Sequence, residues 1–236
     1  MAPYTADKYD PKTPKIFAHK PTMDAFDSIV LIKVGPGKQV FHIHKKLLCD
    51  NSTYFHAAIN GSFKEAKDQS IEMPEDDPGV FRHFQYWTYT GNIVPEPQGA
   101  QEAKTIQWNI LTSLYAFAEA RDIPLLQNAA IDLAILRVQA EHRMPVDLLL
   151  DIYENTSENS RLRKFLVDWA AHKGDLKKKG WFGGRCPIEF FIDLAVAQHA
   201  RTSGSVSEIA NFWESRANYH VEVPVALSNK EKSEQD

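Results

Sequence analysis

Two short apolar, β-branched segments predict two strands in the first fifth of the chain. Residues 29–34 read Ile-Val-Leu-Ile-Lys-Val, an apolar run rich in β-branched side chains, and residues 39–43 read Gln-Val-Phe-His-Ile. The Gly35-Pro36-Gly37 segment between them is unable to continue a strand. The pattern therefore predicts a β-hairpin formed by these two runs.

Helix start and stop signals follow the predicted hairpin. Ser52 is suited to cap a helix, because its hydroxyl can accept a hydrogen bond from a backbone N–H two or three residues later. Asn60-Gly61 predicts that this helix ends in a left-handed turn. Asp77 followed by Pro78 predicts another helix start, since the first helical position does not use the N–H that proline lacks.

Apolar residues at helical spacing continue through the middle of the chain. The stripes are Val80, Phe84 and Trp87, ended by Gly91; Trp108, Leu111, Leu114, Tyr115 and Ala118; and, after Pro124, Leu126, Ala129, Ala130, Leu133 and Leu136. Residues 93–99 contain prolines and a glycine and predict a loop. Strands come first and helices follow, which indicates an α+β fold.

Helical periodicity also covers the last third of the chain. Predicted helix starts and the apolar residues that follow them are Pro145 with Val146, Leu149, Leu150 and Tyr153; Asn159-Ser160 with Leu162, Phe165, Leu166 and Trp169; Pro187 with residues 188–195; and Ser205 with Val206, Ile209, Ala210 and Trp213. Isolated helices of this length are marginal in water. We therefore expect these apolar faces to pack on the preceding domain or on one another.

Composition narrows the class of protein. Of the 236 residues, 43% are hydrophobic and 25% are charged, which is ordinary for a globular protein, and the net charge of −4 argues against a nucleic-acid binder. Cys49 and Cys186 are too few for a disulfide framework and favour a reducing compartment. Residues 1–20 lack the apolar core of a signal peptide, and no run approaches the roughly 18 apolar residues of a membrane span. We expect a cytoplasmic or nuclear protein.

Residues 26–91 carry a series of motifs that resemble one known family. The motifs are Asp27 to Val34, His42-Ile43-His44-Lys45-Lys46-Leu47-Leu48, Ser52-Thr53-Tyr54-Phe55, Gly61-Ser62-Phe63-Lys64-Glu65, Pro74-Glu75-Asp76-Asp77-Pro78 and Phe81 to Gly91. In content and order they resemble the BTB/POZ domain. The resemblance implies an α+β fold, with a small β-sheet flanked by a cluster of α-helices, that binds proteins and has no catalytic site and no cofactor.

The resemblance and the helical pattern together divide the chain. We expect a flexible arm at residues 1–22, a BTB/POZ domain at 23–142, an all-helical extension at 143–227 and a disordered polar tail at 228–236. The extension is similar to the one that follows the BTB domain in many adaptor proteins and in stand-alone fungal-type BTB proteins. That similarity depends on residues 151–156 and on Leu162-Arg163-Lys164.

Phe63-Lys64-Glu65 resembles the hydrophobic-x-Glu motif of BTB proteins that recruit a cullin-3 ubiquitin-ligase scaffold. An apolar anchor two residues from a carboxylate offers a pocket contact together with a charge-assisted hydrogen bond. On this resemblance the candidate cullin contacts are Tyr54, Phe55, Phe63 and Glu65, and the helix from Pro145 would extend them. The implied function is a substrate-receptor subunit of a cullin-3-type ubiquitin ligase. The alternative for Phe63 is a core position.

The resemblance also implies a homodimer. Asp27 and Lys45 stand where dimeric BTB proteins place an acidic and a basic residue at the subunit interface, and Leu47, Leu48 and the segment Met23–Phe26 are further candidates for that interface. An ordinary intrachain ion pair, or two solvated side chains, is the alternative for Asp27 and Lys45. A homodimeric scaffold or transcriptional regulator without a ligase role is therefore the alternative function. A potassium-channel-type tetramerisation module is disfavoured, because no membrane segment follows.

Other chemistry has weak support in the sequence. His42, His44 and Cys49 are too few for structural zinc, which usually takes four ligands, and His44 matches the family's His-Lys pair instead. Nothing places Cys49 or Cys186 beside a histidine base, and Gly183-Gly184 lacks the strand and lysine of a phosphate loop. Lys177-Lys178-Lys179 is an unspecific basic run, a solvated loop or a nuclear import signal. We expect no enzyme, no metal, no small-molecule substrate and no membrane or nucleic-acid partner.

Overall fold

The computed structural model of the chain describes residues 22–61, 69–95, 106–173, 186–204, 209, 211–212 and 214–223. The predictions made for the N-terminal arm before residue 22, the lysines at 177–179, the Ser205 cap and the tail at 228–236 lie outside these residues.

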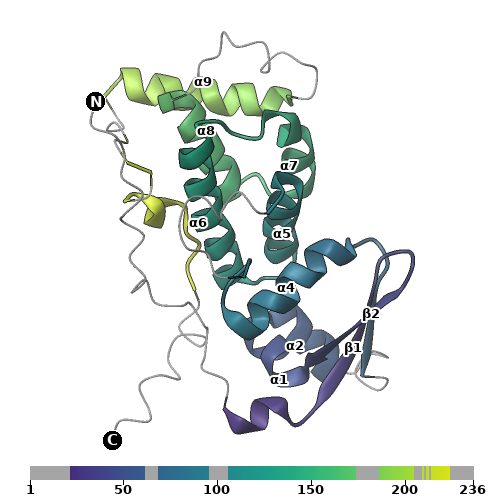
Figure 1. Cartoon of the computed structure of the whole chain (residues 1–236). Helices are drawn as coiled ribbons and strands as arrows, with labels where there is room; N and C mark the ends of the chain where they lie inside the picture. Colours follow the sequence, from purple (N-terminus) through teal and green to yellow (C-terminus); the bar gives the residue numbers. More distant parts are fainter. Residues whose placement is uncertain are drawn as a thin grey trace, which may run out of the picture.

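The described elements run from a strand-containing part into a series of helices (Figure 1). The first part holds η1 (Met23–Phe26), β1 (Ile29–Val34), β2 (Gln39–His44), α1 (Lys45–Asn51), α2 (Thr53–Asn60), β3 (Ser70–Met73) and α4 (Pro78–Thr90). The second part holds α5 (Trp108–Ala120), α6 (Pro124–Glu141), η3 (Val146–Leu148), α7 (Leu149–Asn155), α8 (Arg161–Lys173), α9 (Ile188–Thr202) and η5 (Arg216–Tyr219). The arrangement confirms the α+β prediction.

The predicted hairpin is present, and a third strand joins it. β1 and β2 are antiparallel, with Leu31 opposite His42 and Lys33 opposite Val40. β3 pairs with β1 in parallel, so the described strands lie in the order β2-β1-β3. The expectation that strands precede all helices is wrong for β3, because a parallel pair needs a crossover and α1 and α2 lie between β1 and β3 in sequence.

The turn of the hairpin packs against the start of α4. Gly35 has a φ of +75°, a left-handed conformation that suits glycine. A Cβ atom at this position would lie only 3.0 Å from the Cγ of Pro78. The close approach explains why a glycine, and no larger residue, begins the turn.

Two of the predicted helix caps are present and one helix end differs. The Ser52 hydroxyl accepts a hydrogen bond from the N–H of Phe55 (3.1 Å), and the Asp77 carboxylate caps α4 in the same manner. Gly91 ends α4, as predicted, and its backbone is in a left-handed conformation. The left-handed turn predicted at the end of α2 is wrong, because Gly61 has a φ of −75° and extended backbone geometry.

Aromatic side chains fill the space between the sheet, α2, α4 and α5. The cluster consists of Phe41, Phe55, Phe81, Phe84 and Phe117. The Phe84 ring lies 5.0 Å from that of Phe117 and 5.7 Å from that of Phe55. These contacts join α4 to α5 and bury the inner face of α2.

α6 is buried on more sides than its predicted stripe indicates. Outside the stripe, the buried residues of α6 include Leu125, Asn128, Ile131, Ala134, Ile135, Arg137 and Val138. α5 packs on one side of α6 and η5 on another, so the helix lies within the core and not on its surface. The single apolar stripe in the sequence therefore underestimates how many faces of α6 are buried.

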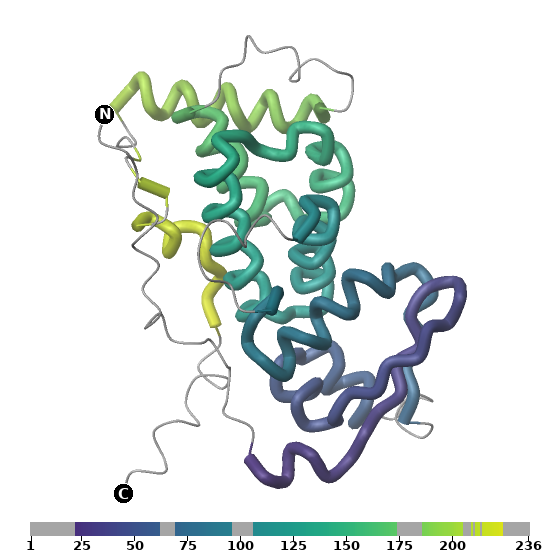
Figure 2. Tube along the Cα trace, viewed as in Figure 1, coloured from purple at the N-terminus to yellow at the C-terminus, as the bar shows by residue number. Residues whose placement is uncertain are grey.

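The helices after His142 pack on α5 and α6, as expected for the extension. The side chain of Asn128 accepts a hydrogen bond from the N–H of Val221 (2.7 Å) and donates one to its carbonyl (3.0 Å). The N–H of Ser157 donates to Glu119 (2.8 Å). One continuous hydrophobic core therefore includes residues of the sheet, of α5 and α6 and of the extension. Figure 2 shows the course of the chain through these elements.

α9 crosses the end of the helical part that is farthest from the sheet (Figure 1). Phe190 and Leu194 turn into the core, and the Tyr153 hydroxyl on α7 donates a hydrogen bond to Asp193 (2.8 Å). Among the described residues, no helix has the length and apolar character needed to cross a membrane.

Candidate functional site

The start of α2 is fastened to the end of α5. The Ser52 hydroxyl donates a hydrogen bond to the carbonyl oxygen of Arg121 (2.7 Å), in addition to capping its own helix. Thr53 donates through Oγ1 to the Asp122 carboxylate (2.6 Å). Because both bonds connect residues far apart in sequence, the exposed face of α2 has a defined position relative to α5.

Tyr54 and Phe55 are neighbours in sequence but face opposite ways. Phe55 is fully buried in the aromatic cluster, whereas the Tyr54 side chain is 44% exposed. The Tyr54 and Phe55 rings form a T-shaped contact, with ring centroids 5.2 Å apart. Of these two candidate cullin contacts, only Tyr54 presents its side chain to a partner, and Phe55 supports it from within the core.

Arg121 connects Tyr54 to the turn before α4. Its guanidinium lies 4.1 Å from the centroid of the Phe117 ring and 5.8 Å from that of Tyr54. It also forms an ion pair with Asp76 (2.6 Å), in which both side chains are mostly buried. Burial raises the pKa of the Asp76 carboxyl, and the nearby guanidinium offsets only part of that rise. Sequence reasoning did not find Arg121, whose partners are 45 and 67 residues away in the chain.

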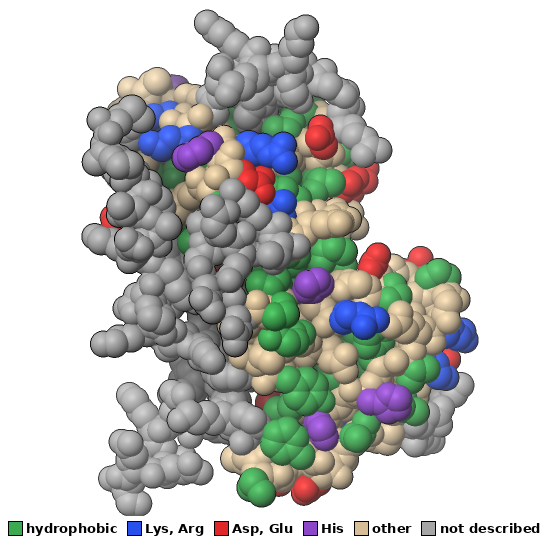
Figure 3. All heavy atoms as spheres, viewed as in Figure 1, with side chains coloured by type: hydrophobic (Ala, Val, Ile, Leu, Met, Phe, Trp, Pro, Cys, Tyr) green, Lys and Arg blue, Asp and Glu red, His purple; other side chains and the backbone are tan. Residues whose placement is uncertain are grey.

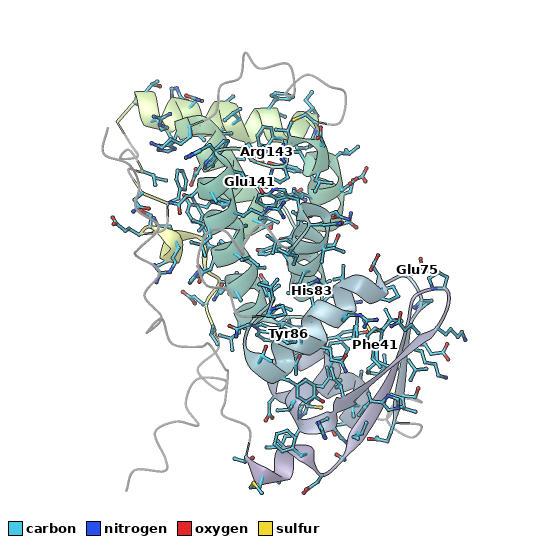
Figure 4. All side chains as sticks on the ribbon, viewed as in Figure 1. Phe41, Glu75, His83, Tyr86, Glu141 and Arg143 are labelled. Atoms are coloured by element: carbon cyan, nitrogen blue, oxygen red, sulfur yellow. The ribbon has the colours of Figure 1, made fainter. Side chains whose placement is uncertain are left out.

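A pocket of about 300 Å³ opens beside this ion pair, between the turn before α4, α5 and α7. Its floor is apolar, with Val80, Ala116, Phe117 and Ile152. The carboxylates that line it are Glu75, Asp76, Asp77 and Asp151, and Arg121 is the one cation among its described lining residues. Figure 4 labels Glu75 in the turn that precedes α4. The pocket thus combines an apolar floor with an acidic rim, which suits a partner segment with apolar and basic side chains.

Phe63 and Glu65, the residues of the hydrophobic-x-Glu motif, lie outside the described residues. The structure describes the chain up to Gly61, at the end of α2, and again from Gln69, immediately before β3. Their assignment as cullin contacts therefore stays a prediction from the resemblance.

The dimer-interface candidates divide into exposed and buried residues. Asp27 is exposed, Lys45 is half-buried, and within the described residues no ion pair joins the two. Leu47 and Leu48 turn inward and are buried within one chain, so they support the fold and add little surface.

Exposed apolar side chains lie instead on η1 and on the outer face of the sheet. They are Met23, Phe26, Ile29, Leu31 and Val40, and Figure 3 shows hydrophobic side chains gathered around η1. In β1 the buried and exposed positions alternate, and Ile29 and Leu31 occupy exposed positions where a solvated sheet would carry polar residues. The sequence signal for this surface is the uninterrupted apolar run at residues 29–32, since a strand with one solvated face would alternate apolar and polar residues.

His42, His44 and Cys49 do not converge on one point. His42 lies on the outer face of β2, and the His44 ring Nδ1 lies 2.8 Å from the Tyr89 hydroxyl, which also accepts a hydrogen bond from the His44 N–H (3.0 Å). Among the described residues, no group of three His, Cys, Asp or Glu side chains is arranged to hold a metal ion. Burial raises the pKa of Cys49, and it raises that of Cys186 to about 11, so neither thiol has the lowered pKa of a nucleophile.

The fold and this surface define a domain that works by binding other proteins. Residues 23–115 match the family model of the BTB/POZ domain, so the chain contains a BTB/POZ domain. That family consists of protein-interaction domains, which bind proteins and self-associate, and it is not a family of enzymes. No curated protein matches the chain. The family match ends within α5, and further helices follow it. The end of the domain at residue 142 and the start of the extension at 143 stay predictions.

Proposed function

We propose that the chain is a substrate-receptor subunit of a cullin-3-type ubiquitin ligase, with the scaffold bound across α2, the end of α5 and α7. One observation carries the proposal: exposed Tyr54 lies next to a pocket between the BTB/POZ part and the extension. The Arg121 side chain lines the pocket and lies over the Tyr54 ring, so the two form one surface. The Phe63-Lys64-Glu65 motif supports the same partner.

The contacts on this surface suit a compact binding site. A tyrosine that is partly exposed and backed by a rigid aromatic neighbour can bury apolar area at low entropic cost, and such residues are enriched among binding hot spots. Asp151 and Asn155 bring α7 to the pocket wall. The helical extension would therefore enlarge the contact, as expected for the helix that follows Pro145.

Binding of the purified full chain to the purified N-terminal domain of cullin-3, measured by biolayer interferometry, tests the proposal. We expect the wild-type chain to bind. Tyr54→Ala and Glu65→Arg should each weaken binding by about 2 kcal/mol, or roughly thirtyfold, as is typical of a hot-spot truncation. Unfolding temperatures should change little for Tyr54→Ala, because its ring is not in the core.

Phe26→Ala is the matched control for Tyr54→Ala. Phe26 is 45% exposed and Tyr54 is 44% exposed, but Phe26 lies on η1. It should leave the cullin affinity unchanged. Absence of wild-type binding would refute the ligase role, and equal losses in both variants would show that the effect is not specific to the α2 surface.

The alternative function, a homodimeric scaffold or transcriptional regulator, has its own support. The apolar side chains on η1 and the outer sheet face are exposed in the single chain, and large exposed apolar patches usually mark protein contacts. A chain that forms dimers but does not bind cullin-3 would favour this function. Both functions place the protein in the cytoplasm or the nucleus.

A further inference from the structure

The outer face of α9 carries an apolar row. Ile188, Ile192 and Val196 are 70%, 56% and 66% exposed. Their spacing of four residues places them on one side of the helix, in a row of about 12 Å at 1.5 Å per residue. Single exposed apolar residues are ordinary on protein surfaces, but a continuous row on one helix is not.

The same helix carries an acidic residue near its start and a histidine near its end. Glu189 stands in the first turn and His199 in the last turn, and both are exposed. In the part of the chain that the structure describes, neither side chain has a hydrogen bond or an ion pair. At 3.6 residues per turn, both side chains lie within one quarter turn of the apolar row.

We propose that α9 is a self-association surface, on which α9 of a second copy of this chain docks in antiparallel orientation. A two-fold axis beside position 194 places Ile192 against Val196 of the second copy. The same axis brings Glu189 level with the second copy's His199. Each contact then occurs twice, as in any isologous interface.

Charge and spacing favour a second copy in this orientation. In a parallel pair the Glu189 carboxylates would lie next to each other, whereas the antiparallel pair brings each of them beside an imidazole that can carry a positive charge. The helix dipoles also oppose favourably in the antiparallel pair. Because Ile192 and Val196 are equally far from position 194, these two members of the row face each other across the axis, and Ile188 lies level with Ala200 of the second copy.

The interface is small and its location is separate from the BTB/POZ surface. Three apolar side chains bury far less than the roughly 800 Å² per partner of a standard stable interface, so the contact is weak and depends on concentration. α9 lies at the end of the molecule opposite the sheet (Figure 1). Two different two-fold contacts on one chain generate open assemblies larger than a dimer.

Sedimentation velocity of the full chain over a concentration series tests the proposal by charge reversal. Glu189→Lys and His199→Glu should each lower the weight-average mass at high concentration, by about twofold if each assembly step joins two units. The double variant should restore the wild-type mass. Within one chain the two residues are about 15 Å apart along the helix, so only a contact between copies explains the rescue. Glu222→Lys, with the same charge change on an exposed residue near η5, should have no effect.

Disulfide trapping tests the orientation. Tagged Ile192→Cys mixed with untagged Val196→Cys should form a tagged–untagged disulfide on mild oxidation. Ile188→Cys should not crosslink to itself, because the two copies of this position lie about 18 Å apart in the antiparallel pair. Wild-type chain controls for Cys49 and Cys186.

Two results would overturn the proposal. One is a wild-type mass that does not rise with concentration and does not change in Ile192→Asp. The other is Ile188→Cys that crosslinks to itself as readily as the mixed pair does.

Discussion

The carboxylate of Glu141, a residue labelled in Figure 4, holds the end of α6 to the start of α5, and its removal is the sharpest stability test of this fold. It accepts hydrogen bonds from Arg137 (2.7 Å), from the indole of Trp108 (3.1 Å) and from Arg143 (3.2 Å). Its side chain is only 12% exposed. The Arg137 guanidinium lies 4.5 Å from the Trp108 ring centroid and also donates to the carbonyl of Ile106.

Glu141→Ala would leave the buried Arg137 without a counter-charge. Removing one partner of a buried ion pair costs about 3–5 kcal/mol, and we expect the low end, about 3 kcal/mol, because Glu141 keeps some contact with water. Glu141→Gln retains an acceptor but loses the charge, so its cost should be about 1–2 kcal/mol. Arg143→Ala is the control. Its side chain is 74% exposed, and a surface ion pair contributes less than about 1 kcal/mol.

Urea unfolding followed by circular dichroism measures these differences in unfolding free energy. A pH series then tests the predicted pH dependence of the contribution of Glu141 to stability. Burial raises the pKa of Glu141, but the hydrogen bonds from Arg137, Trp108 and Arg143 together lower it by more than burial raises it. The pKa of Glu141 therefore lies below its ordinary 4.5. A lowered folded-state pKa stabilises the fold above pH 4.5, and that contribution is lost as the pH falls through the folded-state value. The difference between wild type and Glu141→Gln should therefore shrink only in acid. A cost below about 1 kcal/mol for Glu141→Ala would refute the reasoning.

Three further predictions concern the assembly of the chain. Truncation after His142 should give an aggregation-prone product in light scattering, since it exposes the faces of α5 and α6 that the extension covers; a soluble fragment with unchanged melting temperature would show independent halves. Light scattering of the full chain at low micromolar concentration should give about twice the 26.8 kDa chain mass, and a monomer over the whole range would contradict a BTB/POZ dimer. Asp27→Ala should reduce the dimer fraction while it changes the unfolding free energy of the monomer by less than about 1 kcal/mol, because Asp27 is exposed in one chain.

Local signals predicted most of the secondary structure. The hairpin around Gly35, the cap at Ser52 and the start of α4 at Asp77 all depend on residues within a few positions of one another. Such short-range hydrogen bonds and steric limits act before any tertiary contact forms. They are therefore readable from the chain without its fold.

Local sequence signals did not predict the structure correctly where packing against a segment distant in sequence decides it. β3 has only four residues, and its strand conformation depends on the parallel partner β1. The helical spacing of α6 showed one stripe, but α5 and η5 cover further faces. In both elements, packing against chain that is remote in sequence outweighs local preference.

For the candidate site, too, the sequence determined some features and only the tertiary structure decided the others. The sequence alone determined that a BTB/POZ domain is present, since its motifs lie in order along residues 26–91 and the family match begins at residue 23. It singled out Tyr54 and Phe55 together but could not separate them, because only the aromatic cluster decides which ring turns inward.

Tertiary structure alone brought Arg121 over Tyr54, closed the acidic pocket with α7 and left one face of α9 exposed. These features depend on how helices far apart in sequence pack on one core, and no local spacing encodes that arrangement. Short sequence motifs thus determined the type of domain, whereas long-range packing decided which surfaces are available to partners.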